Sequence, residues 1–242
     1  ISGKIDRRST LIGLCALAAC KGKPVSKVDA ADYDSFWLWA GVRPQPVLKQ
    51  ARTIYLHYAE IRQIDPDRLE VLRPQMPRLQ RPDIWLVLRI ETLRFPGALM
   101  DRVITELVHW RDAGNKVAGL QIDFDARTRF LSKYAAFLAK IRRQLPKDFK
   151  LSITGLLDWS ANGDPAGLDD LSAVIDEVVV QTYQGRKTIF GYAGYLKQLG
   201  RLRVPFKVGL VQGGEWSEPP ELQSFPQFRG FVVFLVNPER AD

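Results

Sequence analysis

The chain has 242 residues with a formal net charge of +8. After residue 35 no linker or low-complexity tract divides the chain, so we expect one domain of the size of a barrel. The positive charge favours anionic partners, but no recognition motif accompanies it, so we expect no nucleic-acid partner. No glycine-rich phosphate-binding loop is present, and we expect no nucleotide or other cofactor.

The N-terminus has the pattern of a secretory signal peptide. Lys4, Arg7 and Arg8 precede a short apolar run at residues 11–19, as in the charged and apolar parts of such signals. A membrane helix needs about 20 apolar residues, and the polar residues 21–24 end this run too early. We therefore predict that residues 1–19 are a signal peptide that is removed.

The segment Leu17-Ala18-Ala19-Cys20 resembles the lipobox of bacterial lipoproteins. The resemblance implies that Cys20 is acylated as the first residue of the mature chain, which then meets the membrane only through its lipid. Lys21 at the next position implies the periplasmic face of the outer membrane if the envelope is Gram-negative. The alternative is that Cys20 is an ordinary thiol beside a conventional cleavage site.

Residues 20–35 are polar and irregular, so we expect a lipidated cysteine and tether ahead of a domain at residues 36–242. Apolar runs at regular intervals in this domain predict eight strands. They lie at Phe36–Gly41, Thr53–Ala59, Ile84–Glu91, Val117–Asp125, Lys150–Asp158, Glu177–Tyr183, Phe206–Gln212 and Gly230–Asn237.

Amphipathic patterns between the strands predict helices at about Pro96–Ala113, Arg127–Leu145 and Ile189–Leu199, whereas the first, second and seventh connections look short or irregular. Eight strands alternating with helices, several of them apolar on both faces, predict an α/β fold of the (β/α)₈ TIM-barrel type in one domain. The alternative is an open doubly wound sheet, although the glycine turn typical of that fold is missing after the first strand. We expect a monomer.

Polar residues gather near the C-terminal ends of these strands, where such barrels carry their reactive groups. Gln121, Asp123 and Asp125 alternate along one strand and so share its inward face. Neighbouring carboxylates repel each other's charge, so one of them could hold a proton and act as a general acid. The alternative is structural, because Asp125 could instead cap the helix that follows.

The segment from Gly119 to Asp125 resembles the fourth-strand signature of the glycoside hydrolase family 18 chitinases, Asp-Gly-x-Asp-x-Asp-x-Glu. The resemblance implies that Asp125 stands at the position of the catalytic acid and Asp123 at that of the Asp that orients the substrate's N-acetyl group. Gln121 stands at the position of the preceding Asp. The family fold is also the barrel predicted above.

The sixth strand adds to this resemblance, because Val180–Gln184 is similar to the family's Met-x-Tyr-Asp motif, and it implies that Tyr183 supports the bound acetamide. Two positions depart from the family pattern. Asp125 replaces a longer Glu, so an acid there lies about 1.5 Å further from the glycosidic oxygen, and a displacement of ~1 Å can cost about 10²-fold in rate. Gln184 replaces a carboxylate. The chain also resembles bacterial lipoproteins with a domain of unknown function, which implies no activity.

The remaining candidates are substrate contacts, and they lie on several strands: Gln121, Gln181, Trp37, Trp39, His57, Glu91 and Asp158. Trp37 and Trp39 suit stacking on a sugar ring, or else ordinary core packing. Asp125 together with Asp158 or Glu91 would also allow a two-carboxylate glycosidase mechanism. The chain has only two histidines, so we expect no metal site.

The leading hypothesis is a glycoside-hydrolase-like barrel that acts on an amino-sugar-containing polysaccharide, with Asp125 as general acid and Asp123 and Tyr183 assisting. The rival is a non-catalytic saccharide-binding or envelope-assembly lipoprotein, which the missing Glu favours. A third interpretation is a scaffold without a sugar site, in which Arg89 neutralises both carboxylates inside a filled barrel.

Overall fold

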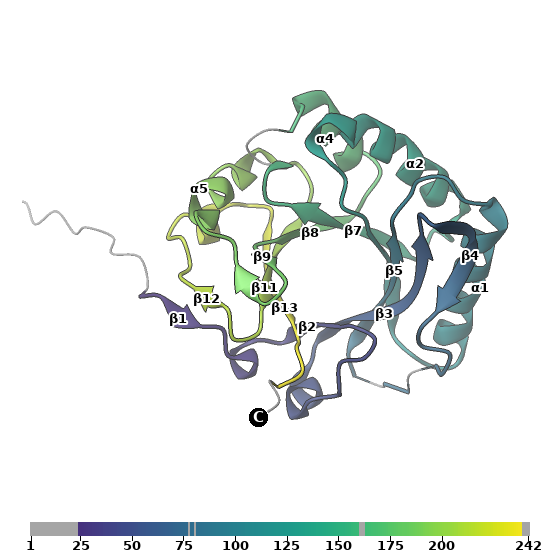
Figure 1. Cartoon of the computed structure of the whole chain (residues 1–242), viewed down its shortest axis with the longest axis horizontal. Helices are drawn as coiled ribbons and strands as arrows, with labels where there is room; N and C mark the ends of the chain where they lie inside the picture. The colour runs from purple at the N-terminus through teal and green to yellow at the C-terminus, as the bar shows by residue number, and fades with distance from the viewer. Residues whose placement is uncertain (1–23, 77, 80, 160–162, 239–242) are drawn as a thin grey trace, which may run out of the picture.

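Eight parallel strands close into a barrel in the computed structural model, which describes residues 24–76, 78–79, 81–159 and 163–238 (Figure 1). Pairing runs around the barrel without a break, because the last strand pairs with the first and the first pairs with the second. The strands are β2 (Ser35–Leu38), β3 (Thr53–Arg62), β5 (Asp83–Ile90), β6 (Val117–Asp123), β7 (Lys150–Leu156), β8 (Glu177–Gln181), β11 (Phe206–Val211) and β13 (Phe228–Phe234). All eight coincide with predicted strands, and the predicted barrel is confirmed.

Helices fill the third to sixth connections and cover the outside of the barrel (Figure 1). They are α1 (Gly97–Asp112), α2 (Leu131–Gln144) after the 3-10 turn Thr128–Phe130, α4 (Pro165–Ser172), and α5 (Tyr192–Leu196) followed by the 3-10 turn Leu199–Arg201. Three of these were predicted, and α4 was not, because its eight residues give too short a periodic signal. Helix α1 ends just before Gly114, whose φ of 93° favours glycine.

The first, second and seventh connections are short or irregular, as predicted. The first contains only the 3-10 turn Pro46–Gln50. The second forms strand β4 (Asp65–Val71), which pairs antiparallel with β3 on the outside of the barrel. The seventh contains β12 (Glu215–Trp216) and the 3-10 turn Leu222–Ser224. A further hairpin, β9–β10 (Tyr183–Gln184 and Lys187–Thr188), follows β8 in the chain.

Part of the segment expected to be a tether packs on the barrel. Strand β1 (Ser26–Lys27) pairs antiparallel with β12, and the 3-10 turn Ala30–Asp32 follows it. Val28 and Ala30 are buried in the main core. The predicted signal peptide and Cys20 lie outside the described residues. Across the described part of the chain, no helix has the length and apolar character to cross a membrane.

The core has an outer and an inner part. The outer part joins the barrel to its helices through residues such as Leu120 and Ile122 on β6 and Val103 on α1. The inner part lies inside the barrel and consists of Trp37, Tyr55, Trp85, Val87, Val179 and Val232. Gly209 makes room for the Trp37 ring, because an added Cβ would lie 2.6 Å from Cζ3 of Trp37.

Candidate functional site

A cavity of about 490 Å³ opens at the C-terminal ends of the strands. Most strands contribute their last residues to it, as is usual for the functional end of such barrels. Its lining is Trp37, Trp39, Arg89, Asp123, Asp125, Leu156, Gln181, Tyr183, Gln184, Gly185, Ile189 and Phe234. Six of the residues predicted from the sequence therefore meet in one place: Trp37, Trp39, Asp123, Asp125, Gln181 and Tyr183.

Asp123 is the buried carboxylate of this cavity. It is the last residue of β6, and its Oδ1 accepts a 2.7 Å hydrogen bond from Thr154 Oγ1 on the neighbouring strand β7. Burial raises the pKa of Asp123 to about 6, while the Thr154 hydrogen bond and the charge of Arg89 lower it and the charge of Asp125 raises it. The predicted elevation is thus present, but loss of hydration is its main cause and repulsion from Asp125 a smaller one.

Asp125 lies two residues beyond β6 and, unlike Asp123, is exposed to solvent at the cavity wall. The chain leaves the strand here, so Asp125 can reach a ligand in the open part of the cavity while Asp123 remains at its floor. The helix that follows takes Phe130 as its N-cap and receives no side-chain cap. The alternative role of Asp125 as the cap of α2 is therefore wrong.

Arg89 on β5 lines the cavity, whereas its sequence position had suggested only a neutralising charge. The strand register places it beside Asp123, on the side opposite Thr154. Within the described residues no ion pair joins the Arg89 guanidinium to a carboxylate, although its charge lowers the pKa of Asp123. Together with the open volume of the cavity, this arrangement disfavours the interpretation of a filled barrel with neutralised carboxylates.

Aromatic side chains form one wall of the cavity. Tyr183 packs edge-on against Trp37 with ring centroids 6.4 Å apart, and it also contacts Phe234 at 5.6 Å. Trp39 contacts Phe234 at 5.5 Å and stacks on His57 at 4.2 Å. Trp37 is almost completely buried, whereas Trp39 is partly exposed. Trp39 is consequently the tryptophan with a ring available to a ligand.

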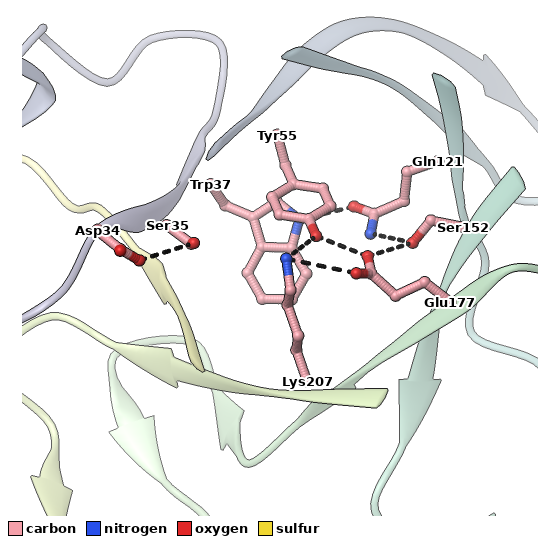
Figure 2. A network of polar contacts seen from close by, with 8 residues as sticks. All are labelled: Asp34, Ser35, Trp37, Tyr55, Gln121, Ser152, Glu177 and Lys207. Atoms are coloured by element: carbon pink, nitrogen blue, oxygen red, sulfur yellow. Dashed lines mark hydrogen bonds and ion pairs between the residues drawn. The ribbon is translucent and has the colours of Figure 1, made fainter. Parts of the chain in front are cut away.

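Below this wall a polar network crosses the barrel interior (Figure 2). Trp37 Nε1 donates to Gln121 Oε1 at 2.7 Å, and Gln121 Nε2 donates to Ser152 Oγ at 3.0 Å. Ser152 Oγ donates to Glu177 Oε1 at 3.2 Å. Gln121 is fully buried in this network and does not line the cavity, so it positions Trp37 where the sequence analysis expected a substrate contact.

The network continues to a charged pair near the N-terminal ends of β8 and β11. Glu177 Oε1 accepts a 2.6 Å hydrogen bond from Tyr55, and its Oε2 lies 3.3 Å from Lys207 Nζ. Lys207 Nζ also donates to the Tyr55 hydroxyl at 3.0 Å. Glu177 and Lys207 were not predicted from the sequence, although strand alternation carries the signal, since Glu177 shares a face with Gln181 and Lys207 with Gly209.

Three other predicted site residues lie away from the cavity lining. His57 lies behind Trp39, where its Nδ1 accepts a 3.5 Å hydrogen bond from the Ala40 backbone, and burial lowers its pKa to about 4. Glu91 is exposed and accepts a hydrogen bond from the Gln63 backbone at 3.0 Å. Asp158 follows β7, and burial raises its pKa. Trp159, the residue after Asp158, is buried.

The sequence model of the family described as "Domain of unknown function (DUF3142)" matches residues 81–211, more than half of the chain. The chain belongs to this family. The matched part of this DUF3142 protein includes the strands that carry Arg89, Asp123, Thr154 and Tyr183. No curated protein matches the chain.

Solved structures show the same fold at low sequence identity. The chitinase domain of the spore coat protein CotE from Clostridium difficile is 15% identical with a TM-score of 0.51, over 81% of this chain and 67% of that one. A chitinase from Bacteroides thetaiotaomicron is 12% identical with a TM-score of 0.53, over 74% and 67%. The xylanase and alpha-amylase inhibitor protein XAIP-II from Scadoxus multiflorus is 10% identical with a TM-score of 0.53, over 83% and 92%. The DUF3142 barrel therefore shares its TIM-barrel fold with these two chitinases and with the inhibitor protein.

Proposed function

We propose that this DUF3142 barrel is a glycoside hydrolase that cleaves an amino-sugar-containing polysaccharide in the cavity at the C-terminal ends of its strands. The observation that carries the proposal is the meeting of Asp123, Asp125 and Tyr183 in a cavity of about 490 Å³ with an aromatic wall. Trp39 would stack on a sugar ring, since its indole is the partly exposed one.

The two carboxylates suit different tasks. Asp125 is exposed at the wall and would donate a proton to the leaving glycosidic oxygen. Asp123 is buried, fixed by Thr154, and would orient the reacting sugar and stabilise positive charge that develops on it. Tyr183, which lines the same cavity, would hold the sugar substituent.

The second candidate is a saccharide-binding barrel that does not cleave its ligand. Asp125 supports this candidate as well, because its side chain is one methylene shorter than the Glu of the chitinase motif and misplacement by ~1 Å can cost about 10²-fold in rate. The aromatic wall would serve binding equally well without a reaction. Turnover and binding must therefore be measured separately.

The test compares release of reducing ends from chitin oligosaccharides and peptidoglycan fragments by the wild type and by Asp125→Asn, with binding measured by calorimetry. Turnover that disappears in Asp125→Asn while binding remains supports the hydrolase. Binding without turnover in the wild type supports the second candidate. Glu91→Gln and Asp158→Asn are matched carboxylate controls, since neither residue lines the cavity, and loss of turnover in either would favour the two-carboxylate mechanism. Absence of both binding and turnover would contradict both candidates.

A further inference from the structure

Beside the cavity, the chain presents a surface that combines cations with exposed apolar side chains. We call it the basic face, and it consists of Val25, Lys27, Arg186, Lys187 and Phe190. Phe190 is fully exposed and Val25 is 67% exposed. Exposed large apolar side chains are uncommon in the described chain, where the others are Ile64 and Phe130. Val25 directly precedes β1 and Phe190 lies two residues after β10, and both of these strands contact β12.

Residues far apart in the sequence meet on the basic face. Lys27, Arg186 and Lys187 line one hollow of about 330 Å³ together with a single carboxylate, that of Glu215. The strands bring them together, because β1 pairs with β12 and β10 packs against β12. In Figure 1, β1, β12 and α5 accordingly lie on the same side of the barrel. Three cations around one acid give this hollow a net positive charge.

Hydrogen bonds and ring packing hold the segments of the basic face against the barrel. The backbones of Val28 and the 213–214 turn exchange hydrogen bonds of 2.9 Å, which fix β1 to the barrel. Tyr192, two residues after Phe190, stacks on the buried Trp216 of β12 with ring centroids 4.8 Å apart. The exposure of Phe190 is thus a property of a packed segment, and no contact of the barrel accounts for an apolar ring at this position.

We propose that the basic face docks on an anionic lipid surface. Cations near such a surface each favour binding through the headgroup phosphates, and Phe190 and Val25 would enter the boundary between headgroups and acyl chains. The expected lipidation of Cys20 agrees with this orientation, because it lies five residues before Val25 and five extended residues reach at most about 18 Å. A lipid at Cys20 would therefore hold the basic face near the membrane.

Docking through the basic face would also orient the cavity. The segment that carries Arg186, Lys187 and Phe190 also contributes Gln184, Gly185 and Ile189 to the cavity lining. Docking would place that wall of the cavity at the membrane, so that a glycan reaches it alongside the lipid surface. The docking itself does not depend on what the cavity binds.

The test is co-sedimentation of residues 21–242, which contain every strand of the closed barrel and its core, with lipid vesicles. The vesicles contain phosphatidylethanolamine and phosphatidylglycerol in one sample and only phosphatidylcholine in the other. We expect binding to the first and none to the second. Lys27→Gln combined with Lys187→Gln should weaken binding to the anionic vesicles about 30-fold. Phe190→Ser should also weaken this binding, although it leaves all the cationic side chains of the basic face in place. High salt should reduce binding of the wild type.

The matched control is Lys140→Gln combined with Lys147→Gln, which removes the same charge from exposed positions in and after α2, across the barrel from β1 (Figure 1). This control should bind like the wild type. An equal loss in the control would show that net charge alone drives binding and would overturn the proposal. The proposal would also be overturned if the wild type failed to bind anionic vesicles, or if the Lys27 and Lys187 double variant bound unchanged. Melting temperatures of all variants verify that the barrel remains folded.

Discussion

Thr154 donates a 2.7 Å hydrogen bond to Asp123 across two neighbouring strands at the floor of the cavity. The bond fixes the orientation of the carboxylate and stabilises its charged form, against the burial that raises its pKa to about 6. Arg89 on the other neighbouring strand acts in the same direction. The protonation of Asp123 therefore depends on residues from three adjacent strands.

Thr154→Val should raise the pKa of Asp123 further, because it removes a donor that favours the carboxylate while keeping the shape of the side chain. Thr154→Ser keeps the hydroxyl and should leave the pKa close to its wild-type value. The pKa can be measured by following the Asp123 carboxyl carbon by NMR during a pH titration. An unchanged pKa in Thr154→Val would show that this hydrogen bond does not control the protonation of Asp123.

Stability should decrease as pH rises through the titration range of Asp123. Its pKa is raised from 3.8 to about 6 in the folded barrel, so between these values the folded state binds the proton more tightly than the unfolded state. The contribution of Asp123 protonation to the free energy of unfolding is complete below about pH 4 and is lost as pH rises past about 6. Its full size is of the order of 3 kcal/mol. Urea unfolding of Asp123→Asn should lack this dependence, whereas Asp170→Asn, at an exposed position, should retain it.

The fold could be predicted from the sequence because each barrel strand is a separate apolar run of ordinary length. Local periodicity does not reveal the parts that depend on distant partners. Strand β4 is polar and exposed along much of its length and exists through its pairing with β3. Strand β1 has only two residues and depends on β12. Neither leaves a period in the sequence that could be recognised.

The candidate site was predictable where strand alternation and strand ends locate side chains, as for Asp123, Asp125 and Tyr183. How deep each side chain lies in the barrel could not be predicted, because the stagger between neighbouring strands decides it. Gln121 shares a face with Asp123 but lies one layer lower, where it bonds to Trp37 and does not reach the cavity. The bulge between His57 and Ala59 similarly changes the register of β3, and alternation alone cannot locate such a change.

Gly209→Ala should destabilise the barrel by about 1–3 kcal/mol, because the new Cβ would enter the space of the Trp37 ring and overpack the interior. Because Trp37 also lines the cavity, ligand binding should weaken together with stability. Thermal unfolding and tryptophan fluorescence measure the two effects. Gly97→Ala is the matched control, since a Cβ there meets no atom within 4 Å; a similar loss in this control would contradict the explanation by overpacking.

The buried pair of Lys207 and Glu177 should show strong coupling. Both side chains are nearly enclosed, with 13% and 12% exposed, and Glu177 Oε1 also accepts a hydrogen bond from Tyr55. Lys207→Met should cost about 3–5 kcal/mol, because it leaves a buried carboxylate without its cation.

The double variant Lys207→Met with Glu177→Gln should recover part of that loss, since no uncompensated charge then remains inside the barrel. Denaturant unfolding of the wild type, the two single variants and the double variant gives the coupling energy directly. Arg111→Met removes the cation of an exposed pair with Asp148 and should cost less than about 1 kcal/mol. Equal costs at the two sites would contradict the expectation that the enclosed pair is stronger than the exposed one.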